Sequence, residues 1–424
     1  RCPVLAMVVL HECDEDREMS HFYFAVALAP LALLALLAVL YSPGPGPSPG
    51  HQGPDVHPLP LPDDLLIGAG TSAVQTEGAW DEDGKSESVL DYILHTGRLE
   101  SAGFQAAHEH DRGADSYHRY KEDVAKAAEL KVYRFSISWA RVLPEADASK
   151  PNAKGVQFYH NLIDEILAHN MKPMVVLYHF DHPQLLEREF NGWRGRRMVD
   201  KFREYATFIF KEYGHKVKMW TSLNEPDVYC TYMLGLQRTI GELAPAEAED
   251  PLPCVHHFLL AHGEASRALR ETGNGGSIGL SVSSLIARPN STRPEDAHAA
   301  ETFNELFQGI MLHPVVFGDY PPVVKQLVGD KLPVFTLEEK AMLANSSDHI
   351  GITVYYGMVA SYRPPGAPTG KGIFLALKQL LKYLDFVNVA YVSSNGSVAY
   401  SFPYDSVLAD LCAFSTNSCN ATNF

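Results

Sequence analysis

Short apolar runs alternate with longer amphipathic segments along this chain from residue 63 onward. The apolar runs predict six strands, Leu65–Ser72, Val132–Ser138, Pro173–His179, Val217–Leu223, Ser277–Ser284 and His349–Tyr355. Between them, apolar residues recur at intervals of three and four, which predicts amphipathic helices around 158–167, 199–210, 257–269 and 303–316. Strands that alternate with helices are typical of βα units, so we expect an α/β fold with a parallel sheet.

The alternation stops after about residue 363. Residues 372–384 predict an amphipathic helix, and Phe386–Val392 with Ser397–Phe402 predict a hairpin around Asn395 and Gly396. Neither element continues the βα pattern. About six βα units are therefore recognisable, whereas a closed (β/α)8 barrel needs eight. We expect an incomplete barrel over residues 63–362 and a divergent tail over residues 363–424.

The N-terminal part of the chain has a different composition. Phe22 to Tyr41 is an uncharged stretch of twenty residues, interrupted only by Pro30. Its length predicts either a signal peptide or a signal-anchor helix, and the second of these would be a membrane anchor. A buried helix of a soluble protein is the alternative. Residues 1–21 precede this stretch as an extension, and residues 42–62 form a linker rich in proline and glycine.

Length and charge limit the classes of function. The 424 residues exceed the roughly 250 of a typical (β/α)8 barrel and can bury a large core. The net charge of −16 argues against nucleic acid and anionic membrane surfaces as partners. The sequence leaves the oligomeric state open.

N-glycosylation sequons agree with entry into the secretory pathway. They occur at Asn290, Asn345, Asn395 and Asn420. Together with the apolar N-terminal stretch, they predict a secreted or membrane-anchored protein whose barrel is extracytoplasmic.

The six cysteines do not form the framework of a disulfide-rich domain in a chain of this size. Cys230 with Cys254, and Cys412 with Cys419, are candidate bridges, and free buried thiols are the alternative. No cysteine or histidine spacing indicates a zinc site, and no glycine-rich loop indicates a nucleotide site.

The segment Ser222–Pro226 (SLNEP) is the strongest candidate for chemistry. Glu225 follows the apolar run of a predicted strand, and catalytic residues of parallel barrels lie at the carboxyl ends of strands. A partly buried glutamate there suits general acid/base catalysis. The alternative is structural, with Asn224 as an N-cap and Glu225 in the first turn of the next helix.

Five segments in order resemble glycoside hydrolase family 1, the retaining β-glucosidases and their relatives. They are Gly70–Trp80 (GTSAVQTEGAW), Tyr117–Val124 (YHRYKEDV), Tyr133–Trp139 (YRFSISW), Leu177–Asp181 (LYHFD) and SLNEP. The resemblance runs from about Asp63 to Tyr355. It implies a (β/α)8 TIM barrel and a β-glycoside or oligosaccharide substrate. It implies no metal or organic cofactor, because a mechanism with two carboxyl groups needs neither.

The resemblance assigns roles to individual residues. Glu225 is expected to be the general acid/base, and Asn224 to bind the sugar 2-hydroxyl. Gln75 and His179 are expected to bind other sugar hydroxyls. Tyr355 is expected to hydrogen-bond the nucleophile, although Thr353 replaces the usual asparagine two residues before it. Tyr356 is the second choice for that role.

Arg134 is implied to keep the nucleophilic carboxylate ionised. Its partner is missing from this sequence, so we expect a buried, unpaired guanidinium. Trp139 and Trp193 match family positions and are expected to serve packing.

The expected nucleophile is absent. The family places a glutamate at the end of strand seven, yet the last glutamate of this chain is Glu339. The tail offers only Asp385, Asp405 and Asp410, none in a matching context. The sequence thus predicts a retaining β-glycosidase-like protein whose activity is impaired. A non-catalytic carbohydrate-binding relative and a membrane-anchored pseudoenzyme are the alternatives.

Overall fold

The computed structural model describes much of the chain between residues 64 and 399. The described residues are 64–97, 111–234, 237, 250–284, 286–354, 357–364, 383–384, 387–392 and 398–399. Several predictions lie outside them: the apolar stretch Phe22–Tyr41, the linker, residues 372–382 of the predicted helix, Tyr355, Tyr356, Asn395, Asn420, Cys412 and Cys419. The last two residues of that predicted helix, 383 and 384, are described and are not helical. Of the helices within these ranges, none combines the length and apolar character that crossing a bilayer requires.

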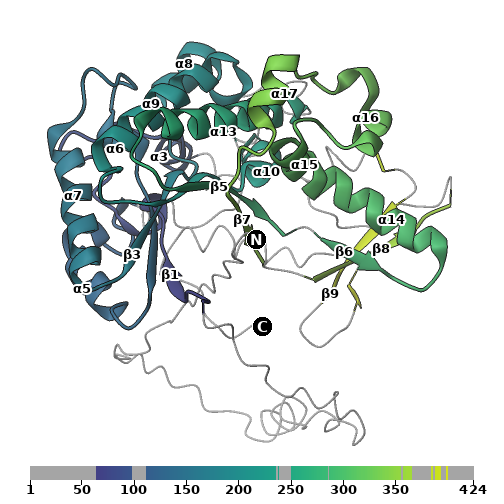
Figure 1. Ribbon diagram of the computed structural model, residues 1–424, viewed down its shortest axis with the longest axis horizontal. Helices are drawn as coiled ribbons and strands as arrows, with labels where there is room; N and C mark the ends of the chain where they lie inside the picture. The colour runs from purple at the N-terminus through teal and green to yellow at the C-terminus, as the bar shows by residue number, and fades with distance from the viewer. Residues whose placement is uncertain are drawn as a thin grey trace, which may run out of the picture. The chain divides into compact units, whose positions relative to one another are not determined.

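Six parallel strands, adjacent in chain order, form the main sheet (Figure 1). They are β1 (Gly68–Gly70), β2 (Val132–Ser136), β3 (Lys172–Tyr178), β4 (Met219–Asn224), β5 (Ser277–Ser283) and β7 (His349–Thr353). The α/β class and the six predicted strands are confirmed. The first strand is shorter than predicted. A Cβ at Gly68 would meet the Val132 carbonyl oxygen at 2.5 Å, so glycine is needed where β1 approaches β2.

Helices follow the strands and cover one side of the sheet (Figure 1). Those before β5 are α2 (Ala73–Thr76), α3 (Val89–His95), α5 (Ser116–Lys126), α6 (Trp139–Val142), α7 (Ala153–Ala168), α8 (Leu185–Phe190), η2 (Gly192–Arg194), α9 (Arg197–Tyr213), α10 (Pro226–Val228), η3 (Tyr229–Met233) and α13 (Leu252–Thr272). Those after β5 are α14 (Pro294–Asn304), η4 (Glu305–Gly309), α15 (Ile310–Phe317), α16 (Pro322–Val328), η5 (Gly329–Lys331) and α17 (Leu337–Leu343).

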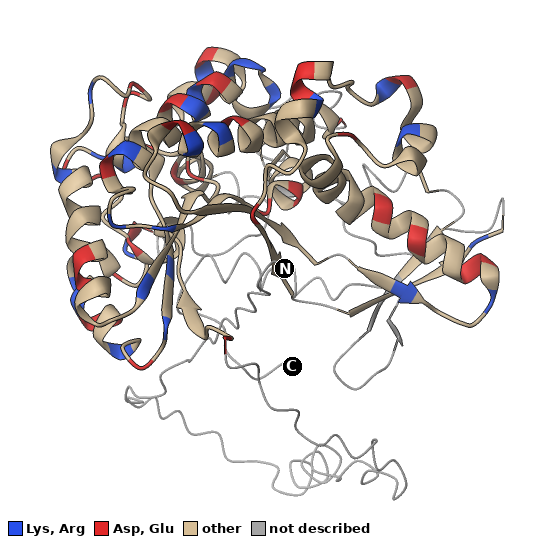
Figure 2. Ribbon diagram, in the orientation of Figure 1, with Lys and Arg blue, Asp and Glu red and all other residues tan. Residues whose placement is uncertain are grey.

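The apolar stripes predicted from the sequence are the buried faces of the long helices. In α7 the buried side chains include Phe158, Tyr159, Leu162, Ile163 and Ile166, all of which belong to the predicted stripe. Charged residues lie mainly on the helices, and most of the sheet carries none (Figure 2). Burying one face of each helix against the sheet is what an amphipathic pattern requires.

The helix predicted at 303–316 is part of a longer helical run. The run begins at Pro294, where a proline at the first position and acidic residues in the first turn favour a helix start. A π-helical segment, η4, interrupts it, and Gly318 ends it with a φ of 85°. The sequence pattern therefore identified only the second half of this run.

A second sheet of four strands, in the order β10-β9-β8-β6, includes residues of the tail. Its strands are β6 (Ala287–Pro289), β8 (Gly357–Tyr362), β9 (Val387–Val392) and β10 (Val398–Ala399). β9 and β10 pair antiparallel, with Val398 opposite Val392, which confirms the predicted hairpin. The hairpin joins β8 and does not extend the six-stranded sheet.

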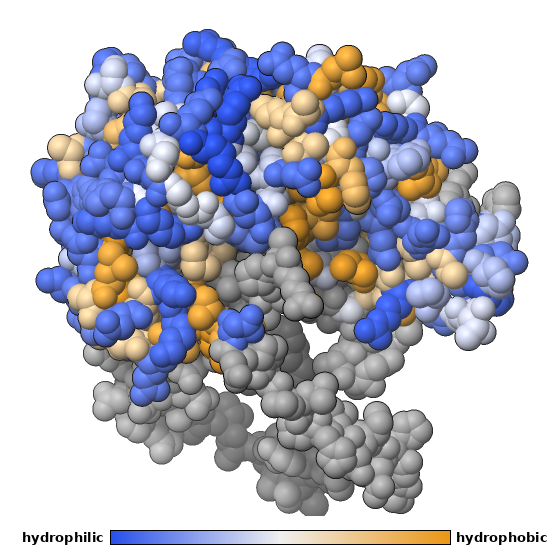
Figure 3. Space-filling view, viewed as in Figure 1, coloured by the Kyte–Doolittle hydropathy of each residue, from blue (hydrophilic) through white to orange (hydrophobic). Residues whose placement is uncertain are grey.

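β1 and β7 are the outer strands of the main sheet, and within the described ranges neither outer edge has a partner strand. Apolar side chains are exposed beside both, with Ile67 at 46%, Ile352 at 49% and Val354 at 71%. Figure 3 shows apolar side chains in the region of β7 and α15. A (β/α)8 barrel covers these edges with two further strands, so the described sheet is an open part of such a barrel.

Candidate active site

Glu225 lies immediately after β4, at the carboxyl edge of the sheet. Its side chain is buried, and its backbone has φ 44° and ψ 56°, a left-handed conformation that is costly for a residue other than glycine. Its amide donates to the Ser281 carbonyl over 2.8 Å, which ties this conformation to β5. Glu225 is the N-cap of α10, but its side chain makes no capping hydrogen bond. The alternative interpretation of SLNEP was a helix start, with Asn224 as N-cap and Glu225 in the first turn. A capping role does not explain why the Glu225 carboxyl group is buried here.

The Asn224 amide connects three other side chains of the predicted site. Its Oδ1 accepts from Nη2 of Arg134 over 2.6 Å. Its Nδ2 lies 3.2 Å from Nε2 of His179 and 3.3 Å from Oε2 of Glu225. Because the arginine can only donate, the amide orientation is fixed, with the NH2 group toward His179 and Glu225. The structure thus brings Arg134, His179, Asn224 and Glu225 together.

The environment of Arg134 differs from the prediction. We expected a buried guanidinium without a partner, and it is buried but donates to Asn224. A neutral amide oxygen takes the hydrogen bond, so the guanidinium is not left unsatisfied. The expectation of an unpaired Arg134 was wrong because a side chain ninety residues away supplies the acceptor.

His179 is neutral at physiological pH. Burial, and secondarily the charge of Arg134, lower the pKa of His179 from 6.5 to about 3. Because Nε2 faces the NH2 group of Asn224, Nε2 accepts and the ring proton lies on Nδ1. Nδ1 has no hydrogen-bond partner among the described residues. A neutral donor of this kind suits recognition of a hydroxyl group.

Phe180 is the second residue with a left-handed backbone at this edge. It follows β3 with a φ of 68° and is buried. The Oδ1 of Asp181, next in the chain, accepts from the His179 amide over 3.3 Å. Burial raises the pKa of the Asp181 carboxyl well above its usual 3.8. Non-glycine residues in this conformation concentrate at functional sites, which agrees with the location of His179.

Gln75 lies in the short helix α2, just after β1, rather than in a loop. It is half-buried, and its Oε1 accepts from the Ser72 hydroxyl over 2.7 Å. Among the described residues no hydrogen bond joins Gln75 to the Asn224 group. β1 and β2 are nevertheless tied at this edge, because the Thr71 amide donates to the Arg134 carbonyl over 2.8 Å.

Thr353, the last residue of β7, contacts the predicted acid/base directly. Its hydroxyl donates to Oε1 of Glu225 and lies 3.2 Å from the Val282 carbonyl oxygen. Sequence reasoning noted Thr353 only as a replacement for an asparagine. The register of β7 on β5, with Thr353 beside Ser283, brings the hydroxyl to Glu225. No local pattern could have revealed this contact, because the two residues are 128 positions apart.

Asp227, two residues after Glu225, was also missed. It is buried, and burial raises the pKa of its carboxyl from 3.8 to about 6, although hydrogen bonds from Ser283 act in the opposite direction. The Ser283 amide lies 3.3 Å from each of its oxygens, and the Ser283 hydroxyl donates to Oδ2. Asp227 therefore joins α10 to the end of β5 and supports the backbone turn at Glu225.

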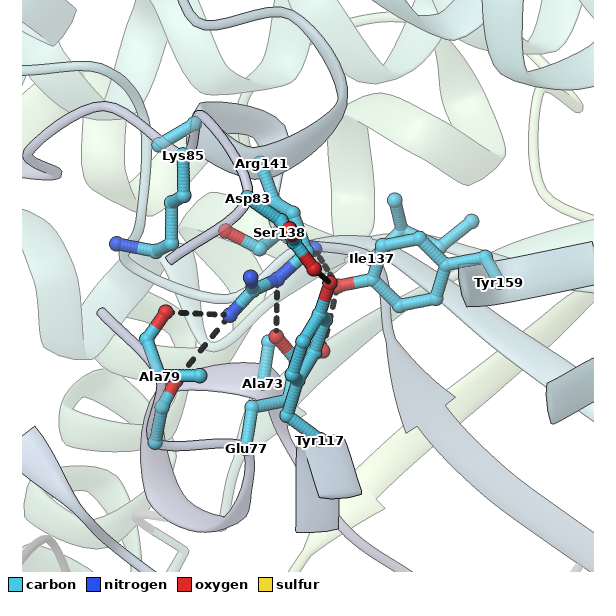
Figure 4. Close-up of polar contacts among 12 residues, drawn as sticks. Ala73, Glu77, Ala79, Asp83, Lys85, Tyr117, Ile137, Ser138, Arg141 and Tyr159 are labelled. Atoms are coloured by element: carbon cyan, nitrogen blue, oxygen red, sulfur yellow. Dashed lines mark hydrogen bonds and ion pairs between the residues drawn. The ribbon is translucent and has the colours of Figure 1, made fainter. Parts of the chain in front are cut away.

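A buried ion pair supports the segment that carries Gln75. Nε of Arg141 lies 2.9 Å from Oε2 of Glu77, and the Tyr159 hydroxyl donates to Oε1 of the same carboxylate (Figure 4). Nη2 of Arg141 also donates to the carbonyls of Gly78 and Ala79. The guanidinium lies over the Tyr117 ring at 4.2 Å. These contacts fix the loop after α2 against α6 and α7.

The two tryptophans that were expected to serve packing lie in the core. Trp139 and Trp193 are almost completely buried, and Trp193 stacks on Phe258 with ring centroids 3.7 Å apart. Their prediction as packing residues is confirmed.

Cys230 and Cys254 form a disulfide, with Cα atoms 5.6 Å apart, so the first candidate bridge is present. The sequon residues Asn290 and Asn345 are exposed.

Comparison with known proteins identifies the class to which this fold and site belong. Residues 57–371 match the profile of glycosyl hydrolase family 1, and the chain therefore belongs to glycoside hydrolase family 1. The predicted resemblance is confirmed over most of the barrel region.

The relatives include plant enzymes. Beta-glucosidase 3 of Arabidopsis thaliana is 40% identical over 309 residues, which cover 70% of this chain and 59% of that protein. A cyanidin 3-O-glucoside 7-O-glucosyltransferase (acyl-glucose) of Delphinium grandiflorum is 38% identical over 315 residues, covering 70% of this chain and 60% of the relative. The chain spans about three fifths of the length of these relatives.

Solved structures agree with the fold. A rice β-glucosidase mutant, in a covalent complex with Glc, superposes with a TM-score of 0.70 at 31% identity, covering 80% of this chain and 71% of that chain. An aphid myrosinase gives a TM-score of 0.66 at 34% identity, with coverages of 73% and 69%. The six-stranded parallel sheet corresponds to part of the barrel in these enzymes.

Proposed function

We propose that this site binds a β-glucoside or a related β-glycoside and that Glu225 is its general acid/base. The observation that carries the proposal is the Asn224 amide, which Arg134 holds in one orientation beside both His179 and Glu225. A preorganised amide, a neutral histidine and a buried carboxyl group suit recognition of sugar hydroxyls next to a proton donor. The relatives named above support a β-glucoside as substrate.

In the retaining reaction, one carboxyl group protonates the departing glycosidic oxygen while a second attacks the anomeric carbon from the opposite side. Glu225 has the first role in this proposal. Asn224 binds the 2-hydroxyl, and Gln75, His179 and Tyr355 bind the substrate or the nucleophile. After departure of the aglycone, the Glu225 carboxylate takes a proton from water while the water oxygen bonds to the anomeric carbon. The bond between that carbon and the nucleophile breaks, which releases the sugar.

We propose further that these 424 residues do not complete this reaction efficiently. No glutamate follows Glu339, so the position after β7 in the family pattern has no carboxylate of the expected kind. Without an attacking group, Glu225 supplies only proton transfer, and the covalent intermediate is not formed. Among the described residues, no strand pairs with the outer side of β7.

The missing glutamate favours a second candidate function, a non-catalytic carbohydrate-binding protein. The binding residues Asn224 and His179 do not depend on a nucleophile for their mutual contacts. A membrane anchor through residues 22–41 would present such a site outside the cytoplasm. The exposed sequons at Asn290 and Asn345 support an extracytoplasmic barrel.

Binding can be tested with a β-thioglucoside, which resists hydrolysis, titrated into the purified chain by calorimetry. We expect saturable binding that Asn224→Ala weakens at least about tenfold, since a hydrogen-bonding group at a sugar hydroxyl is lost. The exposed Asn161→Ala variant is the control and should bind normally. Equal binding by both variants would remove the main support for a sugar site at Asn224.

A further inference from the structure

The hydroxyl of Thr353 has two acceptors within reach but only one proton. It contacts Oε1 of Glu225 and lies 3.2 Å from the Val282 carbonyl oxygen. A hydroxyl donates one hydrogen bond and accepts others, so it cannot donate to both oxygens simultaneously. Which acceptor receives the proton depends on which oxygen carries more negative charge.

The charge on Glu225 decides this competition. A carboxylate accepts a hydrogen bond roughly twice as strong as one to a neutral carbonyl oxygen. When Glu225 is ionised, the hydroxyl proton therefore points to Oε1. When Glu225 is neutral, the Val282 carbonyl, which is fixed in β5, becomes the competitive acceptor.

We propose that Thr353 is a positioning residue that stabilises the Glu225 carboxylate as its proton leaves, by turning its own hydroxyl proton from the Val282 carbonyl to Oε1. This inference deepens the proposed acid/base function and rests on it. In this proposal the exchanged proton belongs to Oε2, the oxygen that lies 3.3 Å from Nδ2 of Asn224. The donor becomes effective at the moment when charge develops on Glu225.

Within the described residues, three further charged or titratable groups belong to this end of the sheet. They are Arg134 on β2, His179 after β3 and Asp227 on α10. Arg134 and His179 contact Asn224 rather than the Thr353 hydroxyl, and Asp227 is bonded to Ser283. Changing Thr353 therefore isolates the contribution of one hydroxyl to the titration of Glu225.

The test is a carbon-13 NMR titration of the full chain with labelled glutamate carboxyl groups, in which Glu225→Gln identifies the Glu225 signal. Thr353→Val keeps the shape and removes the donor. We expect the titration midpoint of Glu225 to be about one pH unit higher in Thr353→Val than in the unchanged chain. In Thr353→Ser, which keeps the hydroxyl, the Glu225 midpoint should stay close to that of the unchanged chain. An unchanged midpoint in folded Thr353→Val, or equal shifts in both variants, would overturn the proposal.

A second measurement needs no variant. The carbonyl carbon of Val282 should shift with the same midpoint as Glu225, because the hydroxyl proton returns to it when Glu225 is neutral. The Ile278 carbonyl, earlier on β5, serves as the control and should not follow that titration. If the chemical shift of the Val282 carbonyl carbon does not change as Glu225 titrates, the proposal is contradicted. Sugar binding is measured separately, so its failure would overturn the proposed function and leave this result interpretable.

Discussion

The guanidinium of Arg134 donates to the side-chain oxygen of Asn224 over 2.6 Å, from β2 to the end of β4. This hydrogen bond decides which way the Asn224 amide faces. It turns the NH2 group toward His179 and Glu225, at 3.2 Å and 3.3 Å. Three segments that are separate in the sequence thereby form one polar group at the carboxyl edge of the sheet.

Removing the guanidinium should weaken sugar binding. Arg134→Met keeps the buried stem but leaves the Asn224 amide free to rotate. Loss of a hydrogen bond from a charged donor corresponds to about a 10- to 100-fold increase in Kd for a β-thioglucoside. Arg188→Met, which changes an exposed arginine on α8, is the matched control. Calorimetric titration of both variants measures the difference, and equal affinities would argue against this role.

The buried ion pair of Glu77 with Arg141 should matter for the stability of the fold. In Glu77→Gln, Arg141 loses the carboxylate that balances its charge, which should cost about 3–5 kcal/mol of unfolding free energy. Urea denaturation measures this loss. The exposed pair of Lys150 with Glu145 provides the control, because Glu145→Gln should leave the unfolding midpoint unchanged. Similar effects of the two substitutions would contradict the assigned importance of burial.

Asp227 should make stability depend on pH in a definite direction. Its pKa in the fold is about 6, above the usual 3.8, so the folded protein favours the neutral carboxyl group. The stabilisation from this group is complete below about pH 4 and is lost as the pH rises to 6, a change of about 3 kcal/mol.

The comparison with Asp227→Asn isolates this contribution, because other titrating groups are present in both proteins. Urea denaturation between pH 4 and pH 7 should show the unfolding free energy of the variant rising relative to the parent as the pH increases. Parallel curves would mean that the Asp227 carboxyl group titrates normally in the fold.

The open edge of the main sheet should promote self-association. Ile352 and Val354 are exposed apolar residues beside an outer strand that has no partner in the described part of the chain. Ile352→Lys and Val354→Lys should reduce the aggregated fraction in sedimentation velocity experiments. Val334→Lys changes an even more exposed apolar residue that lies outside the strands, and it should have little effect. If all three variants aggregate alike, the edge is not the cause.

The strands could be predicted from the sequence because both of their faces are buried. β2, β3 and β4 have almost every residue buried, so they occur as continuous apolar runs that the sequence displays directly. The helical run from Pro294 was only half predicted, since α14 has a weak apolar stripe and its buried positions include Asp296 and Thr302. Propensity at its first turn, rather than periodicity, marks where it begins.

The site was predictable where a local motif carries it and not where the contacts are distant. SLNEP identified Asn224 and Glu225. The role of Thr353 depends on strand register between β5 and β7, which no single segment encodes. The acceptor of Arg134 was missed for the same reason. The sequence predicted which polar residues lie at the ends of strands. The order and register of the strands determine which of these side chains contact one another.

The central proposal is that Glu225 is a proton donor and that these 424 residues lack the attacking carboxylate of the family. It is tested most directly by incubating the purified chain with an aryl β-glucoside, with and without molar sodium azide. Azide can attack the anomeric carbon in place of the nucleophile, while Glu225 protonates the departing aryl oxygen. We predict negligible release of the aryl alcohol without azide. With azide, we predict formation of the inverted α-glucosyl azide, which Glu225→Gln suppresses. Rapid turnover without azide, with retained configuration and dependence on Glu225, would contradict the claim.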